Sequence, residues 1–221
     1  IMNAVNANDS VSNFTLNKEN IAHLAAIKYM TGTVEERMDI MTQKAKGLIG
    51  YNGNDLLIKV IDLAYHTVLS FNFGHFKDVR GYLDVLIVGE SRVGKSSTAE
   101  ALRQTYQLGT FTSLAGNSAT VPGLIGGSNK TPGGAFQTKA GLIPQNHKGL
   151  IIFEEFGKCN SNIVRELTDI RSSNEVRITR VSGTLILPAM VRMISLSNTK
   201  ATGGEIKSIA SYPNGIAVIT E

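Results

Sequence analysis

The segment at residues 89–97 reads GESRVGKSS and directly follows the apolar run YLDVLIV. Glycine, lysine and serine do little to fill a hydrophobic core, so their position after an apolar run needs another explanation. The segment matches the pattern G-x-x-x-x-G-K-S/T through Gly89, Gly94, Lys95 and Ser96. In this pattern the backbone N–H groups of a tight turn converge on phosphate oxygens, the lysine reaches the outer phosphates, and the hydroxyl binds Mg²⁺. The segment therefore predicts a P-loop, which is a phosphate-binding turn between a strand and a helix.

A chance glycine-rich turn is the alternative, because such a pattern also arises by accident in long sequences. The context favours the P-loop, since an apolar strand precedes the segment and an amphipathic helix follows it with its positively polarised N-terminus. We therefore expect ATP to bind along this loop. The expected ATP contacts are Gly89, Glu90, Ser91, Arg92, Val93, Gly94, Lys95, Ser96 and Ser97.

A second apolar run, GLIIFEEF, ends in Glu154 and Glu155. Successive side chains of a strand point to opposite sides, so one carboxylate can face the metal ion and the other the attacking water. Glu154 is the candidate Mg²⁺ ligand together with Ser96, and Glu155 is the candidate catalytic base. Two solvated acids at the end of a surface strand are the alternative, but the P-loop upstream in the same chain favours a catalytic pair.

A third apolar run, MISLSNT, contains Asn198 at its end. A neutral amide at this point can orient both the γ-phosphate and the attacking water, because it is at once a donor and an acceptor. An ordinary asparagine in the turn after a strand is equally compatible with the local sequence. The order along the chain, with Asn198 after the two carboxylates, favours a catalytic role beside Lys95 and Glu155.

Short apolar runs alternate with helical patterns from residue 83 onward. This alternation predicts an α/β fold in which a parallel sheet is covered by helices on both faces. Helical stretches are also expected upstream, in NKENIAHLAAIKYM, TVEERMDIMTQKA and DLLIKVIDLAYHTVL, and a hairpin or loop in the Gly- and Pro-rich residues 121–146. The expected strands are LDVLIV, GTFTSL, LIIFEEF and VRMISLS, and the helices between them are KSSTAEALRQTY and NIVRELTDIRSS.

Taken together, these segments resemble the AAA+ ATPase core of the minichromosome maintenance (MCM) helicases and their plasmid- and phage-type relatives. LIVGESRVGKSS is similar to the P-loop of that family, GLIIFEEFGK to its Walker B strand, and MISLSNT to the strand that ends in its sensor asparagine. The resemblance implies a P-loop NTPase of the AAA+ type, a three-layer αβα sandwich with a central parallel sheet, preceding helices and β-hairpin insertions. It also implies hydrolysis of ATP with Mg²⁺ at the subunit interfaces of a homo-oligomeric ring, expected to be a hexamer, that moves DNA.

The resemblance assigns further residues. It places Ile49 and Gly50, in the segment GLIGYN, beside the adenine base. It also places two hairpins in the pore through which DNA passes, one with Lys130 and Lys139 and one with Arg180. A cation on such a hairpin can hold a phosphate without reading sequence, and a solvated surface charge is the alternative for each residue.

The resemblance divides the chain into an N-terminal lead-in with helices, residues 1–46, and an ATPase core, residues 47–221. In the family an arginine finger and a helical lid follow the sensor asparagine, whereas no SRFD-like segment follows Asn198 here. We therefore expect the lid to be missing from this chain, and the arginine to come from the remainder of the protein or from another chain. Without that arginine the chain is expected to bind nucleotide but to hydrolyse it poorly.

Composition limits the class of protein only loosely. The net charge of +4 mildly favours a partner that carries phosphates. Cys159 is the single cysteine, so it forms no disulfide within the chain, and a reducing compartment, the cytoplasm, is expected. No apolar run is long enough to span a membrane, so no membrane partner is expected.

Two other functions stay open. An AAA+ protein remodeller or regulator would use the same ATPase site with pore loops that grip a polypeptide, and Phe136 in GGAFQT is the candidate aromatic residue for such a grip. A non-catalytic nucleotide-binding module would use ATP only to join subunits. The glutamate at position 154, where aspartate is more usual, favours this second alternative.

Overall fold

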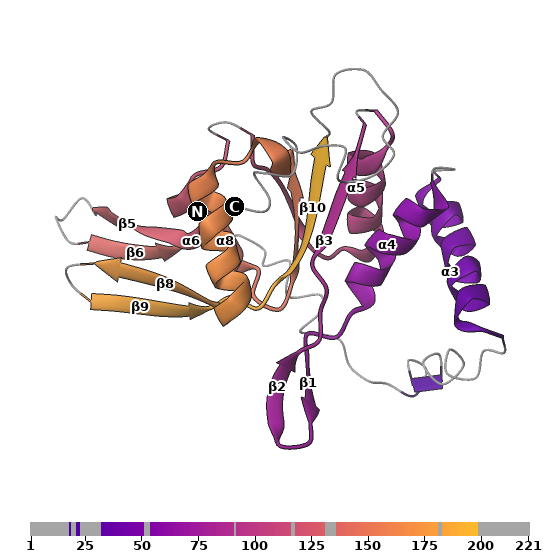
Figure 1. Cartoon of the computed structure of the whole chain (residues 1–221), viewed down its shortest axis with the longest axis horizontal. Coiled ribbons are helices and arrows are strands. Elements are labelled where there is room, and N and C mark those ends of the chain that lie inside the picture. Colours follow the sequence, from indigo (N-terminus) through magenta and orange to yellow (C-terminus); the bar gives the residue numbers. More distant parts are fainter. Residues whose placement is uncertain are drawn as a thin grey trace.

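The fold is built around one parallel sheet, shown in the computed structural model of Figure 1. The structure describes residues 18, 21–22, 32–50, 54–90, 92–115, 118–130, 136–180 and 183–198. The sheet is 4-stranded, and every neighbouring pair in it is parallel. Its strands, in spatial order, are β3 (Val85–Gly89), β10 (Arg192–Asn198), β7 (Leu150–Glu154) and β4 (Thr110–Ser113).

The two faces of the sheet are buried in two separate hydrophobic clusters. Along β7, Leu150 and Ile152 belong to one cluster, whereas Ile151 and Phe153 belong to the other. All four of these side chains are fully buried, because side chains of a strand alternate between faces and both faces are covered here. This arrangement explains why the sequence of β7 is continuously apolar rather than alternating.

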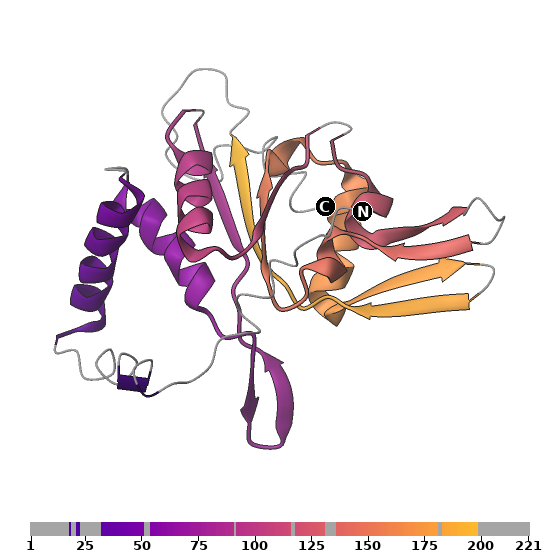
Figure 2. The same cartoon turned by 180° about the vertical axis from the view of Figure 1, so that it is seen from behind.

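Helices cover both faces of the sheet. The cluster with Leu150 contains side chains of α3 (Val34–Ile49), α4 (Asp55–His66) and α5 (Lys95–Tyr106). The cluster with Ile151 contains side chains of α6 (Val121–Ile125), α7 (Leu142–Gln145) and α8 (Ser161–Ser173), together with Cys159 after the 3-10 turn η1 (Phe156–Lys158). The result is a three-layer αβα sandwich, as Figures 1 and 2 show from opposite sides.

Three antiparallel hairpins extend from this sandwich. The hairpins β5–β6 (Gly126–Lys130 and Phe136–Ala140) and β8–β9 (Glu175–Arg180 and Gly183–Pro188) project side by side, as both views show. Gly126 allows the two hairpins to pack closely, because a Cβ at this position would lie 2.8 Å from Ile178 Cδ1 and 2.6 Å from the Lys139 carbonyl oxygen. The third hairpin, β1–β2 (Ser70–Phe73 and Phe76–Arg80), projects in a different direction, directly before the P-loop strand.

The structure confirms the α/β class, the parallel sheet and the expected strands and helices from residue 83 onward. The stretch TVEERMDIMTQKA lies in α3, which begins with a capping box between Thr33 and Glu36. Most of NKENIAHLAAIKYM lies outside the described residues. The boundary between residues 46 and 47 stays a prediction. The hairpin β1–β2 was not expected from the sequence, and no helix within the described ranges has the length and hydropathy to cross a membrane.

Candidate nucleotide-binding site

The carboxyl ends of β3 and β10 bring the P-loop and the candidate sensor asparagine together. These two strands pair in parallel, and Asn198, the last residue of β10, lies opposite Gly89, the last residue of β3. In open parallel sheets, ligands bind outside the carboxyl ends of the strands. Residues far apart in sequence, one at each strand end, therefore meet at the edge where a phosphate group would be bound.

Lys95 is the central cation of this edge. It is the first residue of α5, and only 7% of its surface is exposed. Its Nζ donates to the carbonyl oxygens of Gly89 at 3.0 Å and Glu90 at 2.6 Å, and to Asn198 Oδ1 at 3.0 Å. All three acceptors are neutral, and no described carboxylate forms an ion pair with Lys95. Burial lowers the pKa of this ammonium from its ordinary value, as expected for a cation that lacks a counter-charge.

Two residues directly before α5 have left-handed backbone conformations. Gly94, the N-cap of α5, has a φ of 83°, and Arg92 has a φ of 68°. No side chain caps this helix, so its first N–H groups are not satisfied by a capping oxygen. Unpaired N–H groups and the positive end of the helix dipole attract phosphate. The residues therefore fit a nucleotide phosphate, although Ser91 lies outside the described residues.

A pocket of about 510 Å³ lies beside the P-loop. Its walls come from β3, the P-loop and the first turns of α4, and they are largely apolar. Ile49 and Gly50, the residues expected beside the adenine base, are not among its lining residues. Ile49 packs instead against the hydrophobic cluster under α4, and Gly50 caps α3 with a φ of 63°. The pocket is lined by Asn54, Leu56, Leu57, Val60, Leu86, Ile87, Val88, Gly89, Glu90, Val93 and Lys95.

The sequence did not predict that α4 lines this pocket. Its apolar stretch indicates a buried helix, and Leu57 is indeed buried, yet Leu56 remains 66% exposed at the pocket. The local signal for the helix start was available, because Asn54 accepts hydrogen bonds from the N–H groups of Leu56 and Leu57. That signal locates the helix, but it does not show that the first turn lies beside the P-loop.

The two candidate acids have different backbone conformations. Glu154 is the last residue of β7 and lies opposite Ser113 of β4. Glu155 lies beyond the strand, with a φ of 56°, so the expected alternation of side chains along a strand does not apply to it. Its carboxylate pairs with Lys158, with 2.5 Å between Glu155 Oε1 and Lys158 Nζ. The backbone turns into η1 directly after Glu154, so the two carboxylates do not alternate along one strand as expected.

The η1 turn also approaches β10 closely. A Cβ on Gly157 would lie 2.5 Å from Ser197 Oγ, a distance that real Cβ atoms do not show. Ser197 is 2% exposed and directly precedes Asn198. The glycine therefore allows the turn that carries Glu155 to pack against the end of the sensor strand.

The residues expected to hold Mg²⁺ are compatible with that role. Ser96 lies in the first turn of α5, and Glu154 lies at the carboxyl end of β7. A hydroxyl and a carboxylate are oxygen ligands of the kind Mg²⁺ prefers, and nucleotide phosphates supply further ligands in such sites. When bound, the ion would neutralise charge on the phosphates.

The expected DNA-binding cations lie on the paired hairpins. Lys139 is an exposed residue of β6 opposite Gly127. Lys130 is the last residue of β5 and Arg180 the last residue of β8, and the side chains of both lie outside the described part of the chain. The side chain of Phe136, the candidate for a polypeptide grip, also lies outside it. The roles of these four residues stay predictions.

The sheet order, the loop and the buried lysine define a P-loop NTPase of the α/β class. A comparison with models of protein families matches the MCM P-loop domain over residues 53–211. The chain therefore belongs to the MCM P-loop domain family of AAA+ ATPases. A search of curated proteins finds no match.

Proposed function

We propose that the protein is an ATP-dependent motor that moves DNA through a ring. The observation that carries the nucleotide site is the bond between Lys95 Nζ and Asn198 Oδ1, at 3.0 Å. This bond joins the residue proposed to bind the outer phosphates to the residue proposed to sense them. Membership of the MCM P-loop domain family supports DNA as the partner and a ring as the assembly.

Each side chain has one proposed task. Lys95 binds the β- and γ-phosphates, and its exchange of neutral carbonyl acceptors for phosphate oxygens favours the charged lysine. Ser96 and Glu154 would hold Mg²⁺. Glu155 takes the proton of the attacking water, and Asn198 orients that water relative to the phosphate.

DNA contacts are proposed for the paired hairpins. The hairpins β5–β6 and β8–β9 project side by side, so Lys130, Lys139 and Arg180 lie on one part of the molecule. In a ring, repeated contacts between such cations and the DNA backbone add up to a salt-sensitive grip that is independent of sequence.

ATP turnover with and without DNA tests this proposal. We expect DNA to stimulate ATP hydrolysis by the assembled protein. Lys95→Ala should abolish nucleotide binding, whereas Glu155→Gln should keep binding and lower kcat by about a hundredfold or more. Arg180→Ala should reduce the stimulation by DNA, and Lys44→Ala, which removes an exposed cation from α3, is the control. Turnover that is equally fast with and without DNA would exclude the motor.

A second candidate function is a nucleotide-binding module without turnover. The observation that favours it is the ion pair that engages the Glu155 carboxylate with Lys158. A base held by a cation is less available to a water molecule. Measuring bound nucleotide per chain together with product release in the assembled protein separates the candidates, because a pure binding module retains ATP unhydrolysed.

A further inference from the structure

Arg92 lies in the P-loop in a backbone conformation that favours glycine. Its φ is 68°, in the left-handed region, where a Cβ lies too close to the following carbonyl oxygen. The pattern G-x-x-x-x-G-K-S/T leaves position 92 free, so the loop itself does not require an arginine there. A glycine would adopt the same conformation with less strain. The arginine therefore needs an explanation that the backbone does not supply.

Two of the other left-handed residues have a local explanation. Gln107 and Asn174, with φ values of 50° and 57°, are the C-caps of α5 and α8. Helices commonly end in this conformation. Arg92 precedes a helix instead of ending one, so this explanation does not apply to it. Backbone strain that local structure does not explain is concentrated at functional sites.

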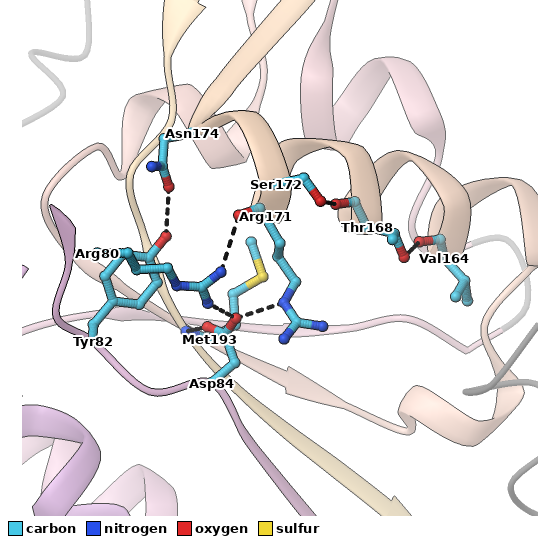
Figure 3. A network of polar contacts seen from close by, with 9 residues as sticks. All are labelled: Arg80, Tyr82, Asp84, Val164, Thr168, Arg171, Ser172, Asn174 and Met193. Atoms are coloured by element: carbon cyan, nitrogen blue, oxygen red, sulfur yellow. Dashed lines mark hydrogen bonds and ion pairs between the residues drawn. The ribbon is translucent and has the colours of Figure 1, made fainter. Parts of the chain in front are cut away.

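The guanidinium of Arg92 is not engaged in an ion pair. Arg92 is exposed, and no described carboxylate pairs with it, including that of Glu90 in the same loop. By contrast, Arg80 and Arg171 both pair with Asp84 in the network of Figure 3. An arginine held by a carboxylate is not available to a ligand. The Arg92 guanidinium is available to an anion.

The position of Arg92 in the loop favours phosphate over the nucleotide base as its ligand. Gly89, Glu90 and Val93 line the pocket of about 510 Å³, whereas Arg92 does not. Arg92 lies two residues before Gly94, the N-cap of α5, and no side chain caps the first N–H groups of this helix. A helix N-terminus of this kind attracts phosphate. A cation outside the pocket and close to this helix start is therefore placed for the phosphates.

We propose that the Arg92 guanidinium binds the phosphates of ATP from within the same chain, as a second cation beside Lys95. The inference rests on the proposed nucleotide site, and it names a side chain where the P-loop pattern assigns only backbone N–H groups. A guanidinium can donate two parallel hydrogen bonds to phosphate, and such charge-assisted bonds are stronger than bonds between neutral groups. Lys95 is buried and Arg92 is exposed, so the two cations contact different phosphate oxygens.

The strain at position 92 gives the inference a consequence for stability. Arg92→Gly should raise the urea concentration at the midpoint of unfolding, measured without nucleotide. The relief of the left-handed strain exceeds the entropy that glycine adds to the unfolded chain. The same change should weaken ATP binding, because it removes the guanidinium. A lower midpoint would show that the arginine supports the loop itself, and the inference would then be wrong.

Variants that keep a Cβ separate the charge from the backbone. A fluorescent, non-hydrolysable ATP analogue is titrated with Mg²⁺ into the parent protein and each variant. Arg92→Ala keeps the strained backbone but loses the charge, and it should weaken affinity about tenfold, the effect of losing a charge-assisted hydrogen bond. Arg92→Lys keeps the charge without the planar fork and should give an intermediate affinity. Parent affinity in Arg92→Ala would overturn the inference.

A ligand without phosphate and a matched arginine serve as controls. Adenosine should bind the parent and Arg92→Ala equally, because it has no phosphate for the guanidinium to contact. Equal losses for adenosine and the ATP analogue would assign Arg92 to the base pocket or to the shape of the loop, contrary to the inference. Arg165→Ala removes an exposed arginine from α8 and should leave the affinity for the analogue unchanged.

Lys95→Ala separates this inference from the proposed nucleotide site. If Lys95→Ala abolishes binding of the analogue while Arg92→Ala binds it as the parent does, the nucleotide site stands and the inference fails. If the parent does not bind the analogue, both fail. If Arg92→Ala weakens binding but DNA does not stimulate turnover, the inference stands and the motor fails.

Discussion

At the scale of single residues, Lys95 shows how a buried cation is stabilised at the carboxyl end of β3. A buried ammonium normally needs a carboxylate or a phosphate, because burial removes its hydration. Here two carbonyl oxygens and the Asn198 amide oxygen take that place. Neutral acceptors compensate the lost hydration without cancelling the charge. An incoming phosphate therefore meets a cation that is positioned but not neutralised.

This environment predicts a pH dependence of nucleotide binding. Burial lowers the pKa of Lys95 below the ordinary lysine value of 10.5. Only the protonated form of Lys95 attracts phosphate. Affinity for ADP should therefore fall above the lowered pKa, by up to about tenfold per pH unit. Titration with a fluorescent ADP analogue measures this dependence. Lys95→Arg, which stays charged, should lack the fall; a parallel fall in both proteins would assign it to another group.

Gly157 offers a second prediction at this scale. Gly157→Ala places a Cβ 2.5 Å from Ser197 Oγ, so we expect the free energy of unfolding to drop by about 1 to 3 kcal/mol. Ser197→Ala removes the clashing hydroxyl and leaves Ser197 Cβ 3.8 Å away. In the Ser197→Ala background, Gly157→Ala should therefore lower the free energy of unfolding by less than it does in the parent protein. Urea unfolding of the four proteins measures the coupling, and strictly additive losses would contradict this account.

At the scale of elements, Asp84 connects parts of the chain that are distant in sequence. It is 10% exposed and lies just before β3, where it contacts the end of β2, the C-terminal turn of α8 and the start of β10. Tyr82 adds a hydrogen bond of 2.9 Å to Asn174, at the junction between α8 and β8. These contacts therefore link β3, the strand before the P-loop, to the start of the hairpin β8–β9.

Removing the Asp84 carboxylate should therefore destabilise the protein. Asp84→Ala leaves the guanidinium groups of Arg80 and Arg171 without their shared acceptor, and the Met193 N–H without its partner. We expect the free energy of unfolding to fall by about 2 to 4 kcal/mol. Glu175→Gln, in an ion pair whose side chains are 40% and 65% exposed, should change it by less than about 0.5 kcal/mol. Equal effects of the two changes in urea unfolding would argue against the network.

At the scale of the whole molecule, the parts predictable from the sequence are those with a local signature. β7 is recognisable because both of its faces are buried, and the P-loop because its glycines and lysine occur at fixed spacing. The hairpin β1–β2 escaped notice because its apolar residues face solvent rather than a core. The pocket wall from α4 and the Glu155–Lys158 pair depend on tertiary placement and on a backbone turn, which no pattern of residues specifies.

Cys159 provides a probe of how the whole sandwich opens. This single cysteine is 7% exposed in the cluster between α8 and the sheet, and burial raises the pKa of its thiol to about 11. Only the thiolate reacts with a disulfide reagent, so labelling in the native state should be roughly a hundredfold or more slower than in concentrated urea. The measurement is the rate of thiol modification at a fixed pH. Rapid labelling without urea would mean that α8 separates readily from the sheet, and the turn that carries Glu155 would then lack a firm support.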